Sequence, residues 1–230
     1  CAICSAAVPG DRPPLCDLCR SRVGAVPRPL CPRCGLTRLL DIEGAERCPD
    51  CAGWPDYLRA ASACLHQGIP ARLVHGLKYR GYTSLVPYLA ARMVEPARRL
   101  VSGEAPVLVP VPLARSRRRE RGFNQAEILA RELGSMTGWP TASLLVRAAG
   151  GPSLSRLGRR DREAVTEAAY SCRPTASEWD VLRGRSALIV DDVITTGATA
   201  AACSGVLVDA GLRCLGAVSF TRTRGRLDQA

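Results

Sequence analysis

A pair of adjacent carboxylates followed by a hydroxyl-rich turn is the part of this sequence best suited to chemistry. Asp191 and Asp192 follow an apolar, β-branched stretch, residues 186–190, with the length and composition of a buried parallel strand. Parallel strands of α/β sheets present ligands at their carboxyl ends. The residues that follow combine hydroxyl groups with little side-chain bulk: Thr195, Thr196, Gly197, Ala198 and Thr199. Such a segment can close backbone N–H groups and hydroxyls around an anion at a helix N-terminus.

The two carboxylates and the threonine-rich segment after them require different chemical partners. Adjacent carboxylates repel a phosphate, so they require a hydroxyl-bearing or metallic partner, and a ribose diol with Mg²⁺ nearby meets this requirement. One alternative is a buried strand followed by an ordinary polar turn, in which an uncompensated Asp pair would be costly. Another is a Walker-type nucleotide site, but the chain contains no G-x-x-x-x-G-K-[ST] sequence.

The segment VDDVITTGAT, residues 190–199, resembles the ribose-phosphate motif of type I phosphoribosyltransferases. The resemblance implies that Asp191 and Asp192 contact the ribose hydroxyls of phosphoribosyl pyrophosphate, with Mg²⁺ nearby. It also implies that Thr195, Thr196, Gly197, Ala198 and Thr199 hold the 5′-phosphate. The fold expected from it is α/β, with a doubly wound and mainly parallel sheet.

Eight of the twelve cysteines form four C-x-x-C pairs within the first 51 residues. Eight thiolates are the ligand count of two tetrahedral Cys₄ zinc sites. The simplest ligand sets are Cys1, Cys4, Cys16, Cys19 and Cys31, Cys34, Cys48, Cys51. An interleaved pairing satisfies the same count. A disulfide framework is the rival interpretation, but the nucleotide-type domain downstream and the lack of a signal peptide favour a reducing cytoplasm and therefore zinc.

The cysteine and proline pattern divides the chain into a small module and a larger domain. We expect a double zinc ribbon at residues 1–53, a linker at 54–60 and a phosphoribosyltransferase-like domain at 61–230. Apolar periodicity predicts strands at 60–65, 107–113, 186–190 and 214–221, and helices at 70–78, 85–100, 122–133 and 200–209. Gly81 and Gly211 are expected to end two of these helices. No stretch is long and apolar enough to span a membrane.

The formal net charge of +11 is concentrated in the larger domain, since residues 1–60 hold eight Arg against seven Asp or Glu. One basic cluster follows the apolar stretch 107–113 directly. In a doubly wound sheet this cluster and the Asp191 segment can meet at the strand ends, where the arginines would hold pyrophosphate. The arginines assigned to this role are Arg117, Arg118, Arg119 and Arg121. A solvated charge run is the alternative.

Four motifs behind the cysteine-rich segment extend the resemblance to most of the chain. LKYRG (77–81), PVPL (110–113), RGFNQA (121–126) and VDDVITTGAT resemble the ComF family of bacterial natural competence. The resemblance implies a cytoplasmic protein of the phosphoribosyltransferase fold that is linked to the uptake of transforming single-stranded DNA. It indicates neither an acceptor nor a reaction.

Two functions from different classes fit these features. In the first, an acceptor nucleophile displaces pyrophosphate from the ribosyl group. In the second, the same pocket senses a ribose phosphate or grips single-stranded DNA while the ribbons dock a DNA-uptake helicase or channel. Of the ten aromatic residues only Phe123 lies beside a basic cluster in the sequence, which argues against tight intrinsic single-strand binding.

Residues 144–170 depart from the ComF pattern. Relatives carry a Gln before a Leu here, and later an Arg followed by an Asn, whereas this chain has Leu154 before Leu157 and then Arg162 and Val165. In transferases this segment forms a flexible cover over pyrophosphate, which Gly150, Gly151 and Gly158 would permit. If the lost amides contact an acceptor in relatives, this protein uses a different acceptor or none.

Overall fold

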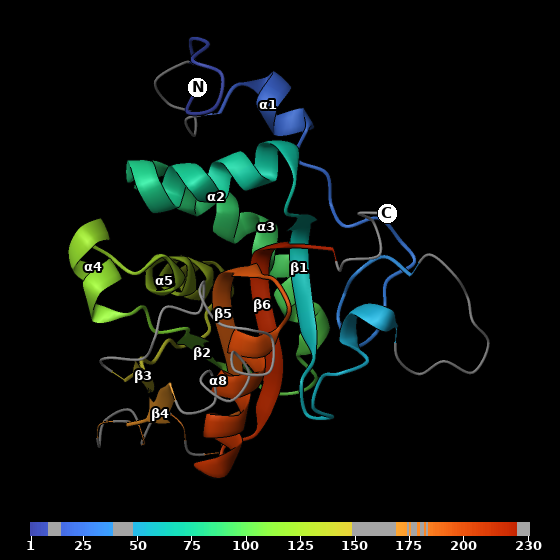
Figure 1. The fold of residues 1–230 in the computed structure, drawn as a ribbon, viewed down its shortest axis with the longest axis vertical. Coiled ribbons are helices and arrows are strands. Elements are labelled where there is room, and N and C mark those ends of the chain that lie inside the picture. Colours follow the sequence, from blue (N-terminus) through green and yellow to red (C-terminus); the bar gives the residue numbers. More distant parts are fainter. Residues whose placement is uncertain are drawn as a thin grey trace.

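Four parallel strands form the central sheet of this computed structural model (Figure 1). The structure describes residues 1–8, 15–38, 48–148, 169–173, 175, 179, 182 and 184–224. The strands lie in the order β1 (Ala60–Leu65), β6 (Cys214–Arg222), β5 (Ala187–Ile194) and β2 (Val107–Pro110), and each neighbouring pair is parallel. This arrangement confirms the expected α/β fold with a mainly parallel sheet.

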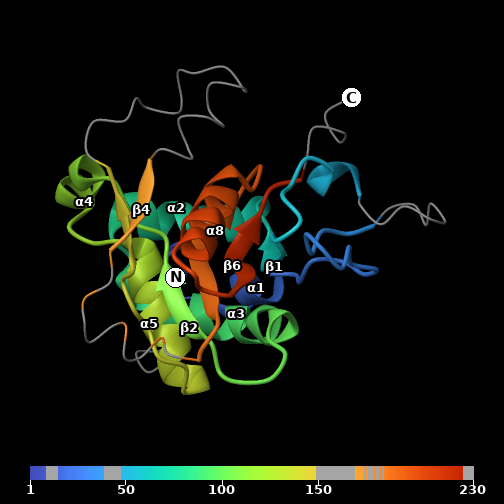
Figure 2. The ribbon, with the colours of Figure 1, turned by 90° about the horizontal axis from the view of Figure 1, so that it is seen from below.

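Helices cover both faces of the sheet, as Figure 2 shows. On one face α3 (Val86–Leu100) and α5 (Gln125–Thr137) pack together, while α8 (Ala198–Asp209) covers the other. Beside α8 lies a small antiparallel pair, β3 (Leu145–Arg147) and β4 (Tyr170–Cys172). Both faces of the central strands are therefore buried, which explains why residues 187–190 are apolar without alternation.

Helix boundaries follow local chemistry. α2 (Gly68–Arg80) ends at Gly81, which adopts the left-handed conformation with φ of 63°. α8 ends in a Schellman motif, in which Gly211 N–H donates to Val208 O at 2.8 Å and Leu212 N–H to Leu207 O at 2.9 Å. Both glycines thus end helices as predicted. The buried residues of α5 recur at helical spacing and include Ala126, Leu129, Ala130 and Leu133.

Two strands differ in length from the sequence prediction. β2 stops at Pro110, because the second proline of PVPL, at position 112, has no N–H to donate to a neighbouring strand. β5 instead runs on to Ile194, because β6 continues beside it up to the pair Ile194↔Arg222. The two acidic residues consequently lie within β5 and not in a turn after it.

The basic cluster after β2 is a short helix, α4 (Arg115–Arg121), where the sequence indicated only a charged segment between strand and helix. No residue of α4 is buried, and Gly122 ends it in the left-handed conformation with φ of 79°. α5 begins at Gln125, three residues later than predicted, because Asn124 caps it.

The cysteine-rich segment packs against the α/β domain at two places. The beginning of the chain and α1 (Asp17–Ser21) lie over α2 in Figure 1, where Arg72 Nη2 donates to Ile3 O at 2.5 Å. The second half approaches β1, where a Cβ at Gly35 would come 2.9 Å from Ala60 O. Within the described parts of the chain, no helix combines the length and apolar character needed to cross a membrane.

Candidate functional site

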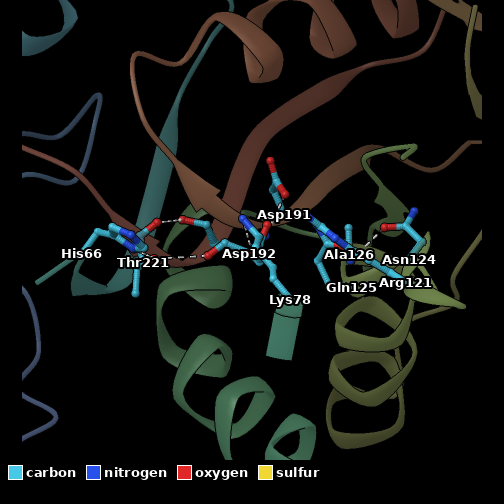
Figure 3. Close-up of polar contacts among 10 residues, drawn as sticks. His66, Lys78, Arg121, Asn124, Gln125, Ala126, Asp191, Asp192 and Thr221 are labelled. Carbon is cyan, nitrogen blue, oxygen red and sulfur yellow. Dashed lines mark hydrogen bonds and ion pairs between the residues drawn. The ribbon is translucent and has the colours of Figure 1, made fainter. Parts of the chain in front are cut away.

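The acidic pair lies where β5 continues beyond the end of β2. The last pair between these strands is Pro110↔Val190, so among the described residues no strand pairs with the β2 side of β5 from Asp191 onward. Neighbouring residues of a strand face opposite sides of the sheet. Figure 3 shows the two carboxylates pointing apart, with Lys78 of α2 beside Asp192. The two acidic residues therefore have different environments.

Asp192 is buried and paired, whereas Asp191 is more accessible. Lys78 Nζ lies 2.6 Å from Asp192 Oδ2, and the Asp192 side chain is 3% exposed. Asp191 is half-buried, and its Oδ1 accepts a hydrogen bond of 2.8 Å from Asp192 N–H. Burial and the neighbouring Asp192 carboxylate raise the pKa of Asp191 well above its usual range, and Lys78 opposes that shift.

A histidine lies at the end of the same edge, beyond Asp192 (Figure 3). His66 Nδ1 and Thr221 Oγ1 are 2.8 Å apart, and Thr221 Oγ1 donates to Asp192 O at 3.4 Å. Burial and the nearby Lys78 lower the pKa of His66. Both effects favour the neutral imidazole, and Lys78 supplies the positive charge beside Asp192.

The hydroxyl-rich segment follows β5 immediately and begins α8. Thr195 and Thr196 are exposed, and Gly197 is the N-cap residue with φ of 88°. Ala187 and Ile189 pack in one core with α8, and Leu188 and Val190 pack in the other with α2. The alternation of side chains along β5 therefore places Asp191 on the α8 side of the sheet. The structure therefore brings one carboxylate, the threonines and a helix N-terminus to one edge.

Tyr170 of β4 also reaches this edge. Its hydroxyl interacts with the Thr199 side chain, and burial is the main reason that the pKa of Tyr170 rises to about 12. The Arg147 guanidinium lies 5.6 Å from the centre of the Tyr170 ring. The β3–β4 pair thereby flanks the threonine segment.

Asn124 attaches the basic helix and α5 to the end of β2. Its Oδ1 accepts from Ala126 N–H at 3.1 Å, and its Nδ2 donates to Val111 O at 3.0 Å. Arg121 Nη1 donates to Gln125 Oε1 at 3.2 Å, and Figure 3 shows both residues on the α5 side of the acidic pair. The RGFNQA motif thus fixes where α4 ends relative to the sheet edge.

The four predicted pyrophosphate arginines do not form one cluster aimed at Asp191. Arg118 pairs with Glu127 at 3.1 Å, and its side chain is 54% exposed. Arg117 and Arg119 are exposed, and only Arg121 is partly buried. Arg121 is consequently the member that the structure holds at the α5 end of the site.

The eight N-terminal cysteines gather into two groups. These are Cys1, Cys4, Cys16, Cys19 and Cys31, Cys34, Cys48, Cys51, and within each group the sulfur atoms all lie within 4.8 Å of one another. Sulfurs around tetrahedral zinc lie about 3.8 Å apart. The separations of Cys4–Cys16 (3.5 Å) and Cys31–Cys51 (3.8 Å) fit that geometry. Sequential pairing, the simpler of the two alternatives, is the arrangement found, and both sites could bind zinc.

Three residues near the site were not singled out from the sequence: Lys78, Trp54 and Tyr170. Lys78 carried a signal, because it is the only lysine in a chain that otherwise uses Arg for its basic side chains. Trp54 donates from Nε1 to Thr196 O at 2.8 Å across 142 residues of sequence, and no local pattern indicates that contact. The predicted cover residues lie outside the described part of the chain: Gly150, Gly151, Leu154, Leu157, Gly158, Arg162 and Val165.

Comparison with known proteins gives matches over most of the chain. It is 25% identical to Competence protein ComFC of Bacillus subtilis over 217 residues, covering 91% of this chain and 84% of that protein. It is 27% identical to DNA utilization protein YhgH of Escherichia coli K12 over 215 residues, covering 91% of this chain and 90% of that protein. A match to Competence protein F of Haemophilus influenzae is 34% identical over 113 residues, 49% of this chain and 47% of that protein. Over most of its length the chain is thus similar to proteins named for competence and DNA utilization.

These similarities agree with the resemblance to the ComF family found in the four sequence motifs. No protein-family model matches the chain. Three of these motifs meet at one edge of the sheet. LKYRG supplies Lys78, RGFNQA supplies Asn124 and Arg121, and VDDVITTGAT supplies the acidic pair.

Proposed function

We propose that this protein belongs to the ComF family, binds phosphoribosyl pyrophosphate with Mg²⁺ and acts in the cytoplasm in the uptake of transforming DNA. The observation that carries the ligand is the position of Asp191, on the α8 side of β5 next to the threonine segment. One carboxylate for ribose hydroxyls and one helix N-terminus for the 5′-phosphate then lie within reach of one ribose phosphate. The names of the relatives support the role in competence.

In this proposal the two carboxylates have different tasks. Asp191, as the accessible one, accepts hydrogen bonds from the ribose hydroxyls and offers an oxygen ligand of the kind that Mg²⁺ prefers. Asp192 holds Lys78 in place. An ammonium group has three N–H donors, and Asp192 requires one of them. Lys78 can therefore also donate to a phosphate oxygen or a hydroxyl of the ligand.

Turnover would be a displacement at C1 of the ribosyl group. A bond forms between C1 and the acceptor nucleophile while the C1–O bond to pyrophosphate breaks, and pyrophosphate leaves with the electron pair. Mg²⁺ would neutralise charge on the departing pyrophosphate. In this proposal Arg121 and Lys78 would stabilise the same charge.

The first test is calorimetric titration of phosphoribosyl pyrophosphate with Mg²⁺ into zinc-loaded protein. Asp191→Asn should weaken binding at least tenfold, whereas Asp209→Asn, at the exposed end of α8, should not change it. Pyrophosphate release is then measured with single-stranded DNA and free bases as acceptors. Acceptor-dependent release makes the protein a transferase, and binding without release leaves a sensor or accessory. Unchanged affinity in Asp191→Asn contradicts the proposal.

A second function, contact with single-stranded DNA, is favoured by one observation that the sequence did not reveal. Tyr79 is 63% exposed, and the Arg121 guanidinium lies 5.1 Å from the centre of its ring. The His75 ring is 4.8 Å from the Tyr79 ring. An exposed aromatic residue beside the arginines of α4 is the combination on which single strands stack. This replaces the sequence-based argument that only Phe123 accompanies the basic cluster.

Fluorescence anisotropy with a labelled oligothymidylate tests this second function. Tyr79→Ala should weaken binding about tenfold, since stacking of one base contributes roughly 1–3 kcal/mol. Replacing Arg117 and Arg119 by Ala should lower the slope of log affinity against log salt by about 1.4, or 0.7 per phosphate contact. Tyr57→Ala, an exposed tyrosine outside α4 and α2, is the matched control. Equal losses in Tyr79→Ala and Tyr57→Ala would argue against this surface.

A further inference from the structure

Trp54 connects the second cysteine group to the threonine segment after β5. It is 7% exposed, and its Nε1–H donates to Thr196 O at 2.8 Å. A Cβ at Gly197 would come 2.5 Å from Cε2 and Cζ2 of the Trp54 ring. The indole therefore occupies the space that a side chain at position 197 would take, and it contacts two consecutive residues of the segment.

Both backbone polar groups of Trp54 are held by residues of the second cysteine group. Its N–H donates to Cys51 O at 3.1 Å, and its carbonyl accepts from Arg33 Nη2 at 2.8 Å. Arg33 lies between Cys31 and Cys34 in one C-x-x-C pair, and Cys51 ends another. Two of the four cysteine-bearing turns in the chain thus fix the backbone of Trp54.

Arg222 provides a third connection between Trp54 and the second cysteine group. Its guanidinium lies 4.5 Å from the Trp54 ring centre, and the residue is 1% exposed. Its positive charge interacts with Cys34, Asp50 and Cys51. Four thiolates with Zn²⁺ carry a net charge of about −2, so a buried guanidinium suits their surroundings. Arg222 also pairs with Ile194, directly before the threonine segment.

We propose that Trp54 is a positioning residue for the phosphate-binding segment, and that zinc at the second cysteine group holds Trp54 in place. Zinc binding to such a small module supplies folding free energy. Loss of this zinc therefore releases Cys51 and Arg33, then the indole, and then Thr196 and Gly197. The first cysteine group has a different neighbour, since its segment contacts α2 and α3 through Arg72 and Arg92. The inference rests on the proposed function only in naming phosphate as the ligand.

The first experiment needs no ligand. In a Trp139→Phe, Trp179→Phe background Trp54 is the sole indole, and its emission reports its burial. Cys34→Ser should lose one zinc per chain and shift the Trp54 emission to the red. It should also move the Gly197 amide resonance in ¹⁵N NMR spectra. Cys4→Ser should lose one zinc from the first group without either change.

The second experiment keeps the zinc ligands intact and measures affinity for phosphoribosyl pyrophosphate. Trp54→Phe removes one hydrogen bond and should weaken binding about fivefold, and Trp54→Ala should weaken it by more than tenfold. Arg222→Lys keeps the positive charge but loses the planar guanidinium over the Trp54 ring, and it should weaken binding of phosphoribosyl pyrophosphate about threefold. All three variants should retain two zinc ions per chain. Trp139→Phe, a tryptophan outside this contact, is the matched control.

The two experiments separate the inference from the proposed function. If the wild-type protein does not bind phosphoribosyl pyrophosphate, the proposed function fails, while emission and the Gly197 resonance still decide whether zinc holds the segment. An unchanged Trp54 emission and Gly197 resonance after loss of the second zinc overturn the inference. If the wild-type protein binds phosphoribosyl pyrophosphate, an equal affinity of Trp54→Ala and Trp139→Phe for this ligand also overturns the inference.

Discussion

Lys78 Nζ on α2 lies 2.6 Å from Asp192 Oδ2 on β5, and the Asp192 side chain is 3% exposed. This ion pair divides the two adjacent acidic residues into one that is engaged within the protein and one that is accessible at the sheet edge. Because a strand alternates its faces, the division follows from the extension of β5 beyond Val190.

Removing Lys78 should leave Asp192 as an unpaired buried charge. Lys78→Met is expected to lower the free energy of unfolding by about 3 kcal/mol, and the double variant Lys78→Met, Asp192→Asn should regain most of that loss. Urea denaturation measures both. Arg99→Gln, which breaks the exposed Arg99–Glu95 pair, should change stability by less than about 0.5 kcal/mol. A Lys78→Met loss as small as that of Arg99→Gln would show that the buried pair contributes nothing.

The raised pKa of Asp191 predicts how stability depends on pH. A carboxyl whose folded pKa exceeds its unfolded value favours the folded state below the unfolded pKa, and this contribution is lost as pH rises through the folded pKa. Asp191→Asn should therefore be more stable than the wild type at pH 8. The difference should shrink toward zero below about pH 4, where the unfolded carboxyl is also protonated. Thermal unfolding across this range checks the sign, and a difference that grows on acidification contradicts it.

The same shift predicts how ligand binding depends on pH. If the Asp191 carboxylate accepts hydrogen bonds from ribose hydroxyls, affinity for phosphoribosyl pyrophosphate should fall as pH is lowered through the raised pKa of Asp191. Asp191→Asn should bind weakly and with a flatter pH profile. Calorimetry between pH 6 and pH 9 measures both profiles, and parallel profiles for the two proteins would argue against a role for this carboxylate.

Asn124 should stabilise the protein through two hydrogen bonds. Asn124→Ala removes the cap of α5 and the donor to Val111 O, so the expected loss is about 2 kcal/mol. Asn124→Asp keeps the cap and loses the donor, and should lose about half as much. Ser135→Ala, at an exposed position of the same helix, serves as control in urea denaturation. Equal stability of the Ala and Asp variants would mean that the cap on Ala126 N–H carries no weight.

Two zinc ions per chain are expected from the two cysteine groups. Elemental analysis should find two in the wild type and one in Cys31→Ser. Cys64→Ser, which changes a buried thiol outside both groups, should retain two. A Cys31→Ser protein that keeps both ions would show that the grouping of ligands is wrong.

The sequence alone determined the features that depend on local pattern. Apolar periodicity predicted β1 at residues 60–65 and a helix at 122–133 that overlaps α5, and glycines predicted the ends of α2 and α8. C-x-x-C spacing predicted the cysteine ligand count, because two residues separated by two others can bind one ion in any context. The motif VDDVITTGAT identified the segment at which the site would lie.

Only the tertiary structure decided which distant residues share that site. The length of β5 depends on its neighbour β6, so the placement of both acidic residues within a strand was not predicted. The pairing of Lys78 with Asp192 and the contact of Trp54 with Thr196 join segments that no helical or strand periodicity relates. Local patterns specify which face of an element is buried, whereas contacts between elements depend on how the sheet orders its strands and where each strand stops.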